Sequence, residues 1–338
     1  MKKKFKVSYE LIMVIILIVM VAAFGVIVGG KFANPVKLVT TMVNATTDVS
    51  YLGVMGMSMT LIILTSGIDL AVFYQMICAG MVCAWVYGKV APGSVALAVI
   101  LALVSCLVSG AFFGAVNGFI ADKTPINPWL ITMSTMYILQ AISWFFGTSF
   151  SFSNDNPIVG VMNYKIAGFI PTQLILLLIV YIIFYILEKK TTFGRYVHAV
   201  GFNENAVNYS GIDAGKIKFW VYTLGGLLSG VGAIMYLGKG LQLNQETGTN
   251  MNIEVIALVV LGGTSTAGGV GGVTGTLLAC LILGVLKKGL ALKSLPGTYY
   301  NFIVGIVLIG SLILFAYLEK KKKLVSRKMA IENMAEQQ

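Results

Sequence analysis

Residues 188–218, EKKTTFGRYVHAVGFNENAVNYSGIDAGKIK, are the longest polar interruption in an otherwise apolar chain. Six hydrophobic segments can be drawn before them and four after them. Helices that cross a membrane are usually joined by short connections, and a long connection with its own order tends to carry function. The chain therefore divides into a helical membrane region and one polar segment, for which we predict a docking role.

The composition places the chain in a membrane. Of its 338 residues, 57% are hydrophobic and 11% are charged, whereas a soluble domain has about 25% charged residues. A soluble fold of this length still exposes roughly a quarter of its unfolded surface, too much for so few polar side chains. Apolar segments of about 20 residues favour helices over a β-barrel. We predict an all-α integral membrane protein with about ten transmembrane helices, some of them broken or half-length.

The predicted spans form one domain, residues 1–318, followed by a basic and then polar cytoplasmic tail at 319–338. A break at 66–69 separates the second span from the third, and the eighth span is too short to cross alone. A glycine-rich segment follows that short span, so each half of the chain contains an interrupted element, as is common where a pathway crosses the membrane. The predicted spans are 10–30, 49–66, 70–87, 94–120, 129–147, 169–187, 219–237, 253–261, 277–292 and 298–318.

The basic residues predict the orientation. With the N-terminus in the cytoplasm, 16 of the 24 Lys and Arg residues fall on the cytoplasmic side. Such an excess marks cytoplasmic loops, so the net charge of +11 reflects topology rather than nucleic-acid binding, and both termini are predicted to be cytoplasmic. Lys287, Lys288 and Lys293 run against this bias. They line an outer vestibule, extend to lipid headgroups or mark a missed half-helix.

Small residues recur at the spacing of closely packed helices in three of the spans. Gly110, Gly114 and Gly118 recur every four residues in the fourth span, Gly25 and Gly29 do so in the first, and Gly226 and Gly230 in the seventh. This spacing lets two helices approach closely within a membrane. The pattern indicates a tightly packed bundle and carries no information about substrate.

Motifs for catalysis and nucleotide binding are missing. The chain has no GxxxxGK[ST] nucleotide loop, no HExxH and no GxSxG elbow, and its Cys and His residues form no metal-binding pattern. Neither an enzyme nor a metal site is therefore predicted. The glycine-rich segment lacks the lysine of a phosphate-binding loop, and we interpret Gly262, Gly263, Gly268 and Gly269 as a close-packed backbone turn.

Two acidic residues fall within the predicted membrane region, Asp69 after the first break and Glu254 at the start of the short span. Ionisable groups there are costly and indicate function, which in an ion-coupled carrier would be proton or sodium binding. The alternative is that each carboxylate caps a helix N-terminus, where free amides and the helix dipole favour negative charge.

Polar and aromatic side chains within the spans are candidates for lining a solute pathway. Amide, hydroxyl and aromatic groups suit a neutral polyol, and the same groups also serve as hydrogen bonds between helices and as interfacial belts. The candidates are Asp69, Gln75, Asn117, Trp129, Thr132, Gln140, Trp144 and Asn301.

The polar segment has a predicted internal structure. Gly194, Gly201 and Gly211 are its expected turn points. After the second of them, residues 204–209 can form about two helical turns with Asn203 as the N-cap. A short helix held below the membrane between glycine turns would act as a rigid lever.

These stretches, together with others along the chain, resemble a known family. The matching stretches are TFGR at 192–195, AVGFNE at 199–204, SGI at 210–212, EVIA at 254–257, VLGGTS at 260–265, GG at 268–269, GT at 275–276, GL at 289–290, GIDL at 67–70, GAVNG at 114–118 and PWLIT at 128–132. In this order they are similar to permeases of ATP-driven importers of the ribose, xylose and autoinducer-2 type. The broader family includes branched-chain amino acid and nucleoside permeases, and the resemblance covers nearly the whole chain.

The resemblance implies a multi-pass permease subunit of the bacterial plasma (inner) membrane that imports a small neutral solute, a monosaccharide such as ribose or another pentose. Two ATPase subunits, which bind ATP and Mg, would dock on the cytoplasmic side, and an extracytoplasmic binding protein would deliver the solute. A second copy, or a paralogous permease, would complete the pore within the lipid, and the chain itself would need no cofactor. The residues implied in coupling to the ATPase, within 191–212, are Gly194, Arg195, Tyr196, Ala199, Gly201, Asn203, Glu204, Ala206, Val207, Ser210, Gly211 and Ile212.

The sequence departs from the family pattern near the expected pathway. AVF at 71–73 replaces Ser-Val-Gly, PW at 128–129 replaces Pro-Phe, and Lys288 stands where asparagine is common. These departures leave the solute open, with a nucleoside or a branched-chain amino acid as alternatives. An ion-coupled carrier is a further alternative; it would work without an ATPase and depend on Asp69 or Glu254.

Overall fold

The computed structural model describes residues 9–28, 34–147, 149–245, 251–310 and 313. The first half contains the helices α1 (Tyr9–Val28), α3 (Pro35–Asp48), α4 (Ser50–Leu64), α5 (Val72–Val90), α6 (Val95–Lys123), α7 (Pro128–Phe145), α8 (Pro157–Asn163) and α9 (Thr172–Lys190). The second half contains α10 (Thr192–Phe202), α11 (Glu204–Tyr209), α12 (Ala214–Gly238), α13 (Met251–Leu261), α14 (Val273–Leu292) and a last helix, Gly297–Gly310. The predicted tail and the end of the tenth predicted span lie outside the described residues.

Two short antiparallel strand pairs accompany the helices. β1 (Ser149–Phe150) pairs with β4 (Leu243–Asn244), and β2 (Lys165–Ile166) pairs with β3 (Ile170–Pro171). Each strand has two residues, so the pairs tie connecting segments together rather than form a sheet layer. The predicted all-α class is correct apart from these pairs.

Within the described residues, five helices are long and apolar enough to cross a membrane: α1, α6, α9, α12 and α14. α3 and α4, bent by 55° relative to one another, make a sixth crossing if they are counted as one span. α13 and the helix Gly297–Gly310 are apolar but shorter. The chain is thus a helical integral membrane protein.

The predicted second span, 49–66, corresponds to α4, and the helix α3 before it was not predicted. The Asn34 side-chain oxygen caps α3 by accepting hydrogen bonds from the amides of Val36 at 3.0 Å and Lys37 at 3.3 Å. With Pro35 at the first helical position, these are the usual signals of a helix start, and they outweigh the polar composition.

Asp48, the last residue of α3, gathers two basic side chains from distant helices. Its carboxylate oxygens lie 3.1 Å from the ammonium nitrogen of Lys239 and 3.1 Å from that of Lys288. Lys287 lies against a different group, with its ammonium nitrogen 5.3 Å from the centre of the Tyr300 ring. Two of the three lysines that ran against the charge bias therefore have partners within the protein.

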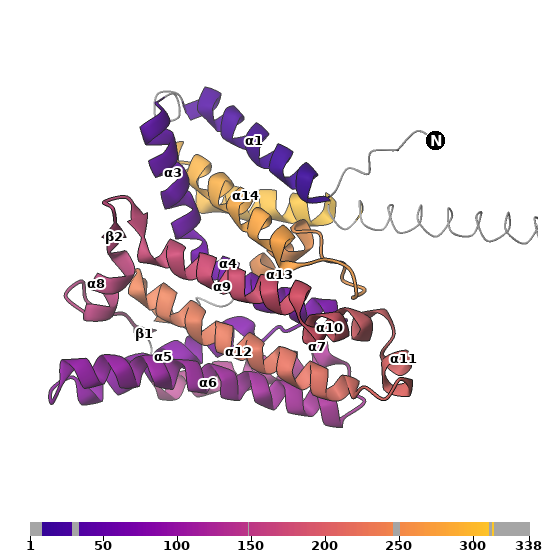
Figure 1. Cartoon of the computed structure of the whole chain (residues 1–338). Coiled ribbons are helices and arrows are strands. Elements are labelled where there is room, and N and C mark those ends of the chain that lie inside the picture. Colours follow the sequence, from indigo (N-terminus) through magenta and orange to yellow (C-terminus); the bar gives the residue numbers. More distant parts are fainter. Residues whose placement is uncertain (1–8, 29–33, 148, 246–250, 311–312, 314–338) are drawn as a thin grey trace, which may run out of the picture.

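α4 lies in the centre of the fold, and every one of its residues is buried. It packs against α9, α12, α13 and α14, and Figure 1 shows it behind α9. α1 lies at the edge of the molecule beside α14 (Figure 1). Because α4 is covered by protein on all sides, it needs no polar face and no lipid-facing face.

α6 and α12 pack backbone against backbone along the predicted glycine positions. A β-carbon on Gly114 would overlap the carbonyl oxygen of Tyr222, and one on Gly226 would overlap that of Gly110. Figure 1 shows the two helices side by side. Close approach of membrane helices depends on small residues at the contact, so this prediction is confirmed.

Candidate functional site

The polar segment 188–218 is almost entirely helical, which corrects the predicted loop. The end of α9, the helices α10 and α11, and the first turn of α12 account for most of it. α11 and its N-cap are confirmed, because the Asn203 side-chain oxygen accepts a hydrogen bond from the Ala206 amide at 3.0 Å. α10 was not predicted; its own N-cap is Thr191, whose hydroxyl accepts a hydrogen bond from the Gly194 amide at 3.2 Å.

The glycines of α10 provide close packing rather than turns. A β-carbon on Gly194 would overlap the carbonyl oxygen of Glu188 in α9, and one on Gly201 would overlap that of Leu64 at the end of α4. Gly211 is a turn as predicted, with φ of +85°. α10 is thus seated directly on the ends of α9 and α4.

The surface of α10 and α11 carries exposed charged and aromatic side chains. Arg195 and Glu204 are exposed, and Glu204 forms an ion pair with Lys218 of α12 at 2.6 Å. Phe202 and Tyr209 are 67% and 93% exposed. Large aromatic side chains on a polar surface are typical of contact sites. Neither aromatic residue was among the predicted coupling residues, although each stands at the end of a polar helical stretch.

The other residues implied in coupling are divided between the surface and the inside of this helix pair. Asn203, Ala206, Ser210 and Gly211 are exposed, Tyr196, Ala199, Gly201 and Ile212 are partly buried, and Gly194 and Val207 are buried. Val207 packs with Val200 and Ala214 in a small apolar cluster that joins α11 to α10 and α12. The pair therefore has a packed interior of its own, and its docking role stays a prediction.

At the first break, α4, α9, α10 and the glycine-rich turn meet in what we call the junction: Ser66, Glu188, His198, Gly201 and Gly269. The Ser66 hydroxyl lies 3.2 Å from the carbonyl oxygen of Gly201 and 3.0 Å from that of Ala267. The Gly269 amide donates a hydrogen bond to the Leu64 carbonyl oxygen at 2.9 Å. One end of the break is therefore bonded both to α10 and to the turn that follows α13.

His198 joins α10 to the glycine-rich turn and to α9. Its Nδ1 lies 2.9 Å from the Gly269 carbonyl oxygen, and its Nε2 lies 3.3 Å from the Glu188 carboxylate. The other Glu188 oxygen accepts the amide of Val273, the first residue of α14, at 2.8 Å. The hydrogen bond with Glu188 raises the pKa of His198, although burial and Lys189 oppose the shift. A protonated ring satisfies both acceptors at once.

α13 bridges the two interrupted elements of the chain. At its N-terminal end, the Asn252 side-chain oxygen accepts a hydrogen bond from the amide of Phe73, in the first turn of α5, at 3.1 Å. At its other end, the glycine-rich turn is bonded to α4 through Gly269 and Leu64. The two elements, predicted in separate halves of the sequence, therefore lie together, and α13 with its turn contacts both sides of the first break.

The four glycines interpreted as a turn adopt conformations that suit it. Gly263, Gly268 and Gly269 have φ angles of +92°, +88° and +73°, in the left-handed region that side chains rarely adopt. Gly262 lies against the backbone of Gly275 in α14, where a β-carbon would meet the Gly275 carbonyl. The turn is thus closely packed, against backbone at Gly262 and against the Tyr9 and Phe202 rings at Gly263 and Gly269.

Three of the predicted pathway residues are gathered at the first break. Asp69 accepts hydrogen bonds from the Ala71 amide at 2.8 Å and from the Gln75 side chain at 3.0 Å. The Thr132 hydroxyl of α7 donates to the Ile68 carbonyl oxygen at 3.0 Å. Asp69, Gln75 and Thr132 are buried, so in this conformation they stabilise the break, and Asp69 accepts from the amide just before α5 without capping the helix itself. Their contact with solute stays a prediction.

The remaining pathway candidates are dispersed. Asn117 is buried in α6, and within the described part of the chain neither atom of its amide group has a hydrogen-bond partner. Trp129 and Trp144 are exposed on α7, and Gln140 of the same helix is partly buried. Asn301 alone of this group lies beside an ionisable residue in a pocket.

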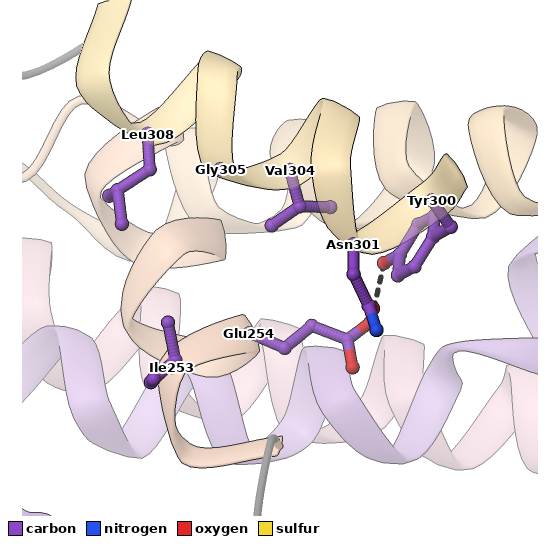
Figure 2. Close-up of a pocket in the computed structure, with 7 residues that line it drawn as sticks. All are labelled: Ile253, Glu254, Tyr300, Asn301, Val304, Gly305 and Leu308. Atoms are coloured by element: carbon purple, nitrogen blue, oxygen red, sulfur yellow. Dashed lines mark hydrogen bonds between the residues drawn. The ribbon is translucent and has the colours of Figure 1, made fainter. Parts of the chain in front are cut away.

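That pocket lies between α13 and the helix Gly297–Gly310 and has a volume of about 190 Å³. Figure 2 shows Tyr300 and Asn301 projecting from the last helix toward Glu254 of α13. The Tyr300 hydroxyl donates a hydrogen bond to the Glu254 carboxylate. Glu254 stands in the first turn of α13, where the helix dipole favours it, but its partner is this hydroxyl from another helix. The wall is completed by Ile253, Val304, Gly305 and Leu308.

Comparison with known proteins assigns this architecture to a transport family. The family described as the branched-chain amino acid transport system, permease component, matches residues 41–312. The ribose import permease protein RbsC of Escherichia coli K12 is 35% identical over 289 residues, which cover 84% of this chain and 87% of the relative. No solved structure matches the chain.

Two further relatives carry different solutes in their names. The fructose import permease protein FrcC of Rhizobium meliloti is 28% identical over 318 residues, covering 90% of this chain and 85% of the relative. The autoinducer 2 import system permease protein LsrD of Photorhabdus temperata is 26% identical over 314 residues, covering 90% of each chain. The similarity therefore extends over most of the chain in each comparison.

Proposed function

We propose that the chain forms the membrane pathway for import of a monosaccharide such as ribose. The chain belongs to the family of permease components of branched-chain amino acid transport systems, and its similarity to a ribose import permease supports a sugar as the solute. It is a sugar-importer type of permease in the bacterial plasma membrane, and not an enzyme. Import systems for ribose, fructose and autoinducer 2 among its relatives support a small polyhydroxylated solute. ATP and Mg would bind to a separate ATPase subunit.

We further propose ten crossings with both termini in the cytoplasm. α5 and α7 have 19 and 18 residues, long enough to cross, and α5 is mostly buried and so needs fewer apolar side chains. α13 supplies one crossing as a half-length helix. The last crossing begins at the helix Gly297–Gly310. The cytoplasmic excess of basic residues supports this orientation.

The observation that carries the coupling proposal is the seating of α10 on both interrupted elements. An ATPase bound to α10 and α11 would displace α10 when it closes on ATP. Because α10 is bonded at Gly201 and His198 to the end of α4 and to the turn after α13, this displacement would reach both. The ATPase and a loaded binding protein would then bias one two-state element from opposite sides of the membrane. A second copy or a paralogous permease would complete the pathway.

The test is reconstitution in liposomes with the ATPase encoded beside this chain and the neighbouring binding protein. We expect ATP hydrolysis stimulated by the loaded binding protein, and flux of radiolabelled ribose that requires ATP. Glu204→Lys, on the exposed face of α11, should weaken ATPase binding about tenfold, because it reverses a charge in the proposed contact. Asp155→Lys, an exposed acidic residue of a different segment, should leave ATPase binding unchanged.

Two results would overturn the proposal. If the ATPase never associates and solute moves down an ion gradient, the chain is a carrier and Asp69 and Glu254 become the leading sites. If ATP-driven flux occurs with leucine or a nucleoside but not with pentoses or hexoses, the machinery is as proposed and the solute class is wrong.

A further inference from the structure

We infer that the pocket of Glu254, Tyr300 and Asn301 opens onto the water-filled solute path and supplies hydrogen bonds to a neutral polyol in transit. This inference rests on the proposed transport function and adds a solute contact that the buried residues at the first break do not provide. Asp69 and Gln75 are fully buried and bonded to one another, so a solute would have to separate them first. The pocket is already open.

Asn301 is an exposed amide on the last helix. The helix Gly297–Gly310 reads GTYYNFIVGIVLIG, and Asn301 is its one amide side chain. Asn301 is exposed on this otherwise apolar helix. An amide facing hydrocarbon would leave its donors and acceptors without partners, at a cost of several kcal/mol. The face of the helix that carries Asn301 therefore meets water or polar groups rather than lipid.

A carboxylate, that of Glu254, lies opposite Asn301. Glu254 is partly buried, comes from a different helix and is oriented by the Tyr300 hydroxyl. A carboxylate in the membrane interior is costly unless it faces a polar cavity or a partner, and such residues mark pathways. Since one hydroxyl does not saturate a carboxylate, which offers about four acceptor positions, Glu254 retains capacity for further donors.

The chemistry of the wall selects a small polyol. Glu254 accepts hydrogen bonds and Asn301 both donates and accepts them, which matches sugar hydroxyls. Ile253, Val304 and Leu308 present an apolar surface to the C–H face of a sugar ring (Figure 2). The pocket volume of about 190 Å³ is below the roughly 300–1,000 Å³ of sites for drug-sized ligands. The pocket is therefore of a size for a single sugar ring.

The position of the pocket connects it to the moving parts. Glu254 is two residues from Asn252, whose side chain is bonded to the Phe73 amide at the first break. The opposite end of α13 leads into the turn that contacts His198 of α10. A shift of α10 that moves α13 would therefore change the separation of Glu254 from Asn301, and with it the affinity for a solute at this site.

Two matched pairs of variants on the last helix test the inference. In the assembled transporter, Asn301→Cys should react with a charged, membrane-impermeant methanethiosulfonate reagent at least tenfold faster than Ile306→Cys, an exposed apolar position one turn further along. The four native cysteines are buried and provide a low background.

Tyr300→Phe should lower ribose flux per ATP about fivefold, whereas Tyr299→Phe, the exposed neighbour outside the pocket, should leave it unchanged.

The outcomes separate this inference from the function on which it rests. Equal, slow labelling of both cysteines would show that the Asn301 face meets lipid, and a disulfide between Asn301→Cys chains without reagent access would show an interface between copies. Either result overturns the pocket while ATP-driven flux by the unmodified chain still supports the transport function. Absence of ATP-driven flux by the unmodified chain overturns the transport function itself.

Discussion

The contact between α6 and α12 and the junction under α10 join helices in different ways. α6 and α12 touch through Gly114 and Gly226, backbone against backbone, with carbonyl oxygens where a β-carbon would otherwise stand. The junction has one such close contact, between Gly201 and the Leu64 carbonyl oxygen, and adds hydrogen bonds made by Ser66 and His198, at 2.9 to 3.2 Å. The first contact depends on a row of glycines along two helices, and the second depends largely on a few polar atoms.

This difference separates a fixed frame from an adjustable contact. Close-packed helices have one arrangement, because a small shift brings backbone atoms into overlap or opens a void. A hydrogen-bonded junction at the edge of the core can exchange partners at little net cost, since each bond contributes about 1 kcal/mol. We therefore expect α6 and α12 to move as one body, and the polar contacts of the junction to rearrange more readily.

The largest expected effect is at the helix contact. Gly114→Ala should destabilise the protein by about 2 kcal/mol or more, because its β-carbon would overlap the Tyr222 carbonyl and push α6 from α12. Gly88→Ala in α5 is the matched control, since nothing lies within 4 Å of its added carbon. There the higher helix propensity of alanine should be neutral or stabilising. Thermal unfolding in detergent measures both, and equal melting temperatures would contradict the fixed frame.

The next effect is at the junction. Glu188→Gln and His198→Gln should each weaken it by about 1 kcal/mol, and the double variant by little more than either, because both remove the same contact. Thermal unfolding and ribose moved per ATP hydrolysed are the two measurements. Lys123→Gln, which removes an exposed ion pair with Asp122 elsewhere in the chain, should change neither. Strict additivity of the two junction variants would show that these residues act independently.

A pH dependence should appear at the junction and not at the helix contact. Because Glu188 raises the pKa of His198 above its usual value of 6.5, protonated His198 contributes stability below the unfolded-state pKa. That contribution, about 1 kcal/mol at most, is lost as the pH rises through the folded-state pKa. The melting temperature of the unmodified chain should be lower at about pH 9 than at about pH 6. The difference should be smaller in His198→Gln. An identical fall in both would assign the dependence to other groups.

The smallest effect is at the cap of α11. Asn203→Ala removes the acceptor for the Ala206 amide and should destabilise α11 locally by about 0.5–1 kcal/mol. Asn205→Ala, an exposed position inside the same helix, is the control and should stabilise it slightly. Hydrogen exchange of the α11 amides measures the difference. Unchanged exchange in Asn203→Ala would show that packing through Val207, rather than the cap, holds this helix.

Features with a local cause were predicted correctly. The membrane class follows from composition, and α11 with its Asn203 cap follows from residues within a few positions of one another. Close packing of α6 was predicted because Gly110 and Gly114, four apart, must lie on one helix face, whereas the identity of its partner, α12, was not predicted. Each of these depends on neighbours in sequence, or on the solvent that surrounds the whole chain.

Features that depend on distant neighbours were missed or assigned wrongly. Gly194 and Gly201 lower helix propensity, so α10 was predicted as turns, yet packing against Glu188 and Leu64 favours a helix with glycine at those positions. Ser66 contacts residues 135 and 201 positions away. Phe202 and Tyr209 are distinguished from other aromatic residues by their exposure, and exposure depends on the fold.

The sequence by itself determined the membrane environment, most of the long helices and the family, because hydrophobicity, capping and motif order are properties of short stretches and of composition. The tertiary structure decided which stretches meet: that α13 bonds to both sides of the first break, that His198 reaches Glu188, and that Glu254 faces Tyr300 and Asn301 across a pocket. These pairings depend on how the helices pack in three dimensions. The energies of these contacts depend on the distances between residues that are far apart in the chain. Sequence periodicity and helix propensity carry no information about those distances.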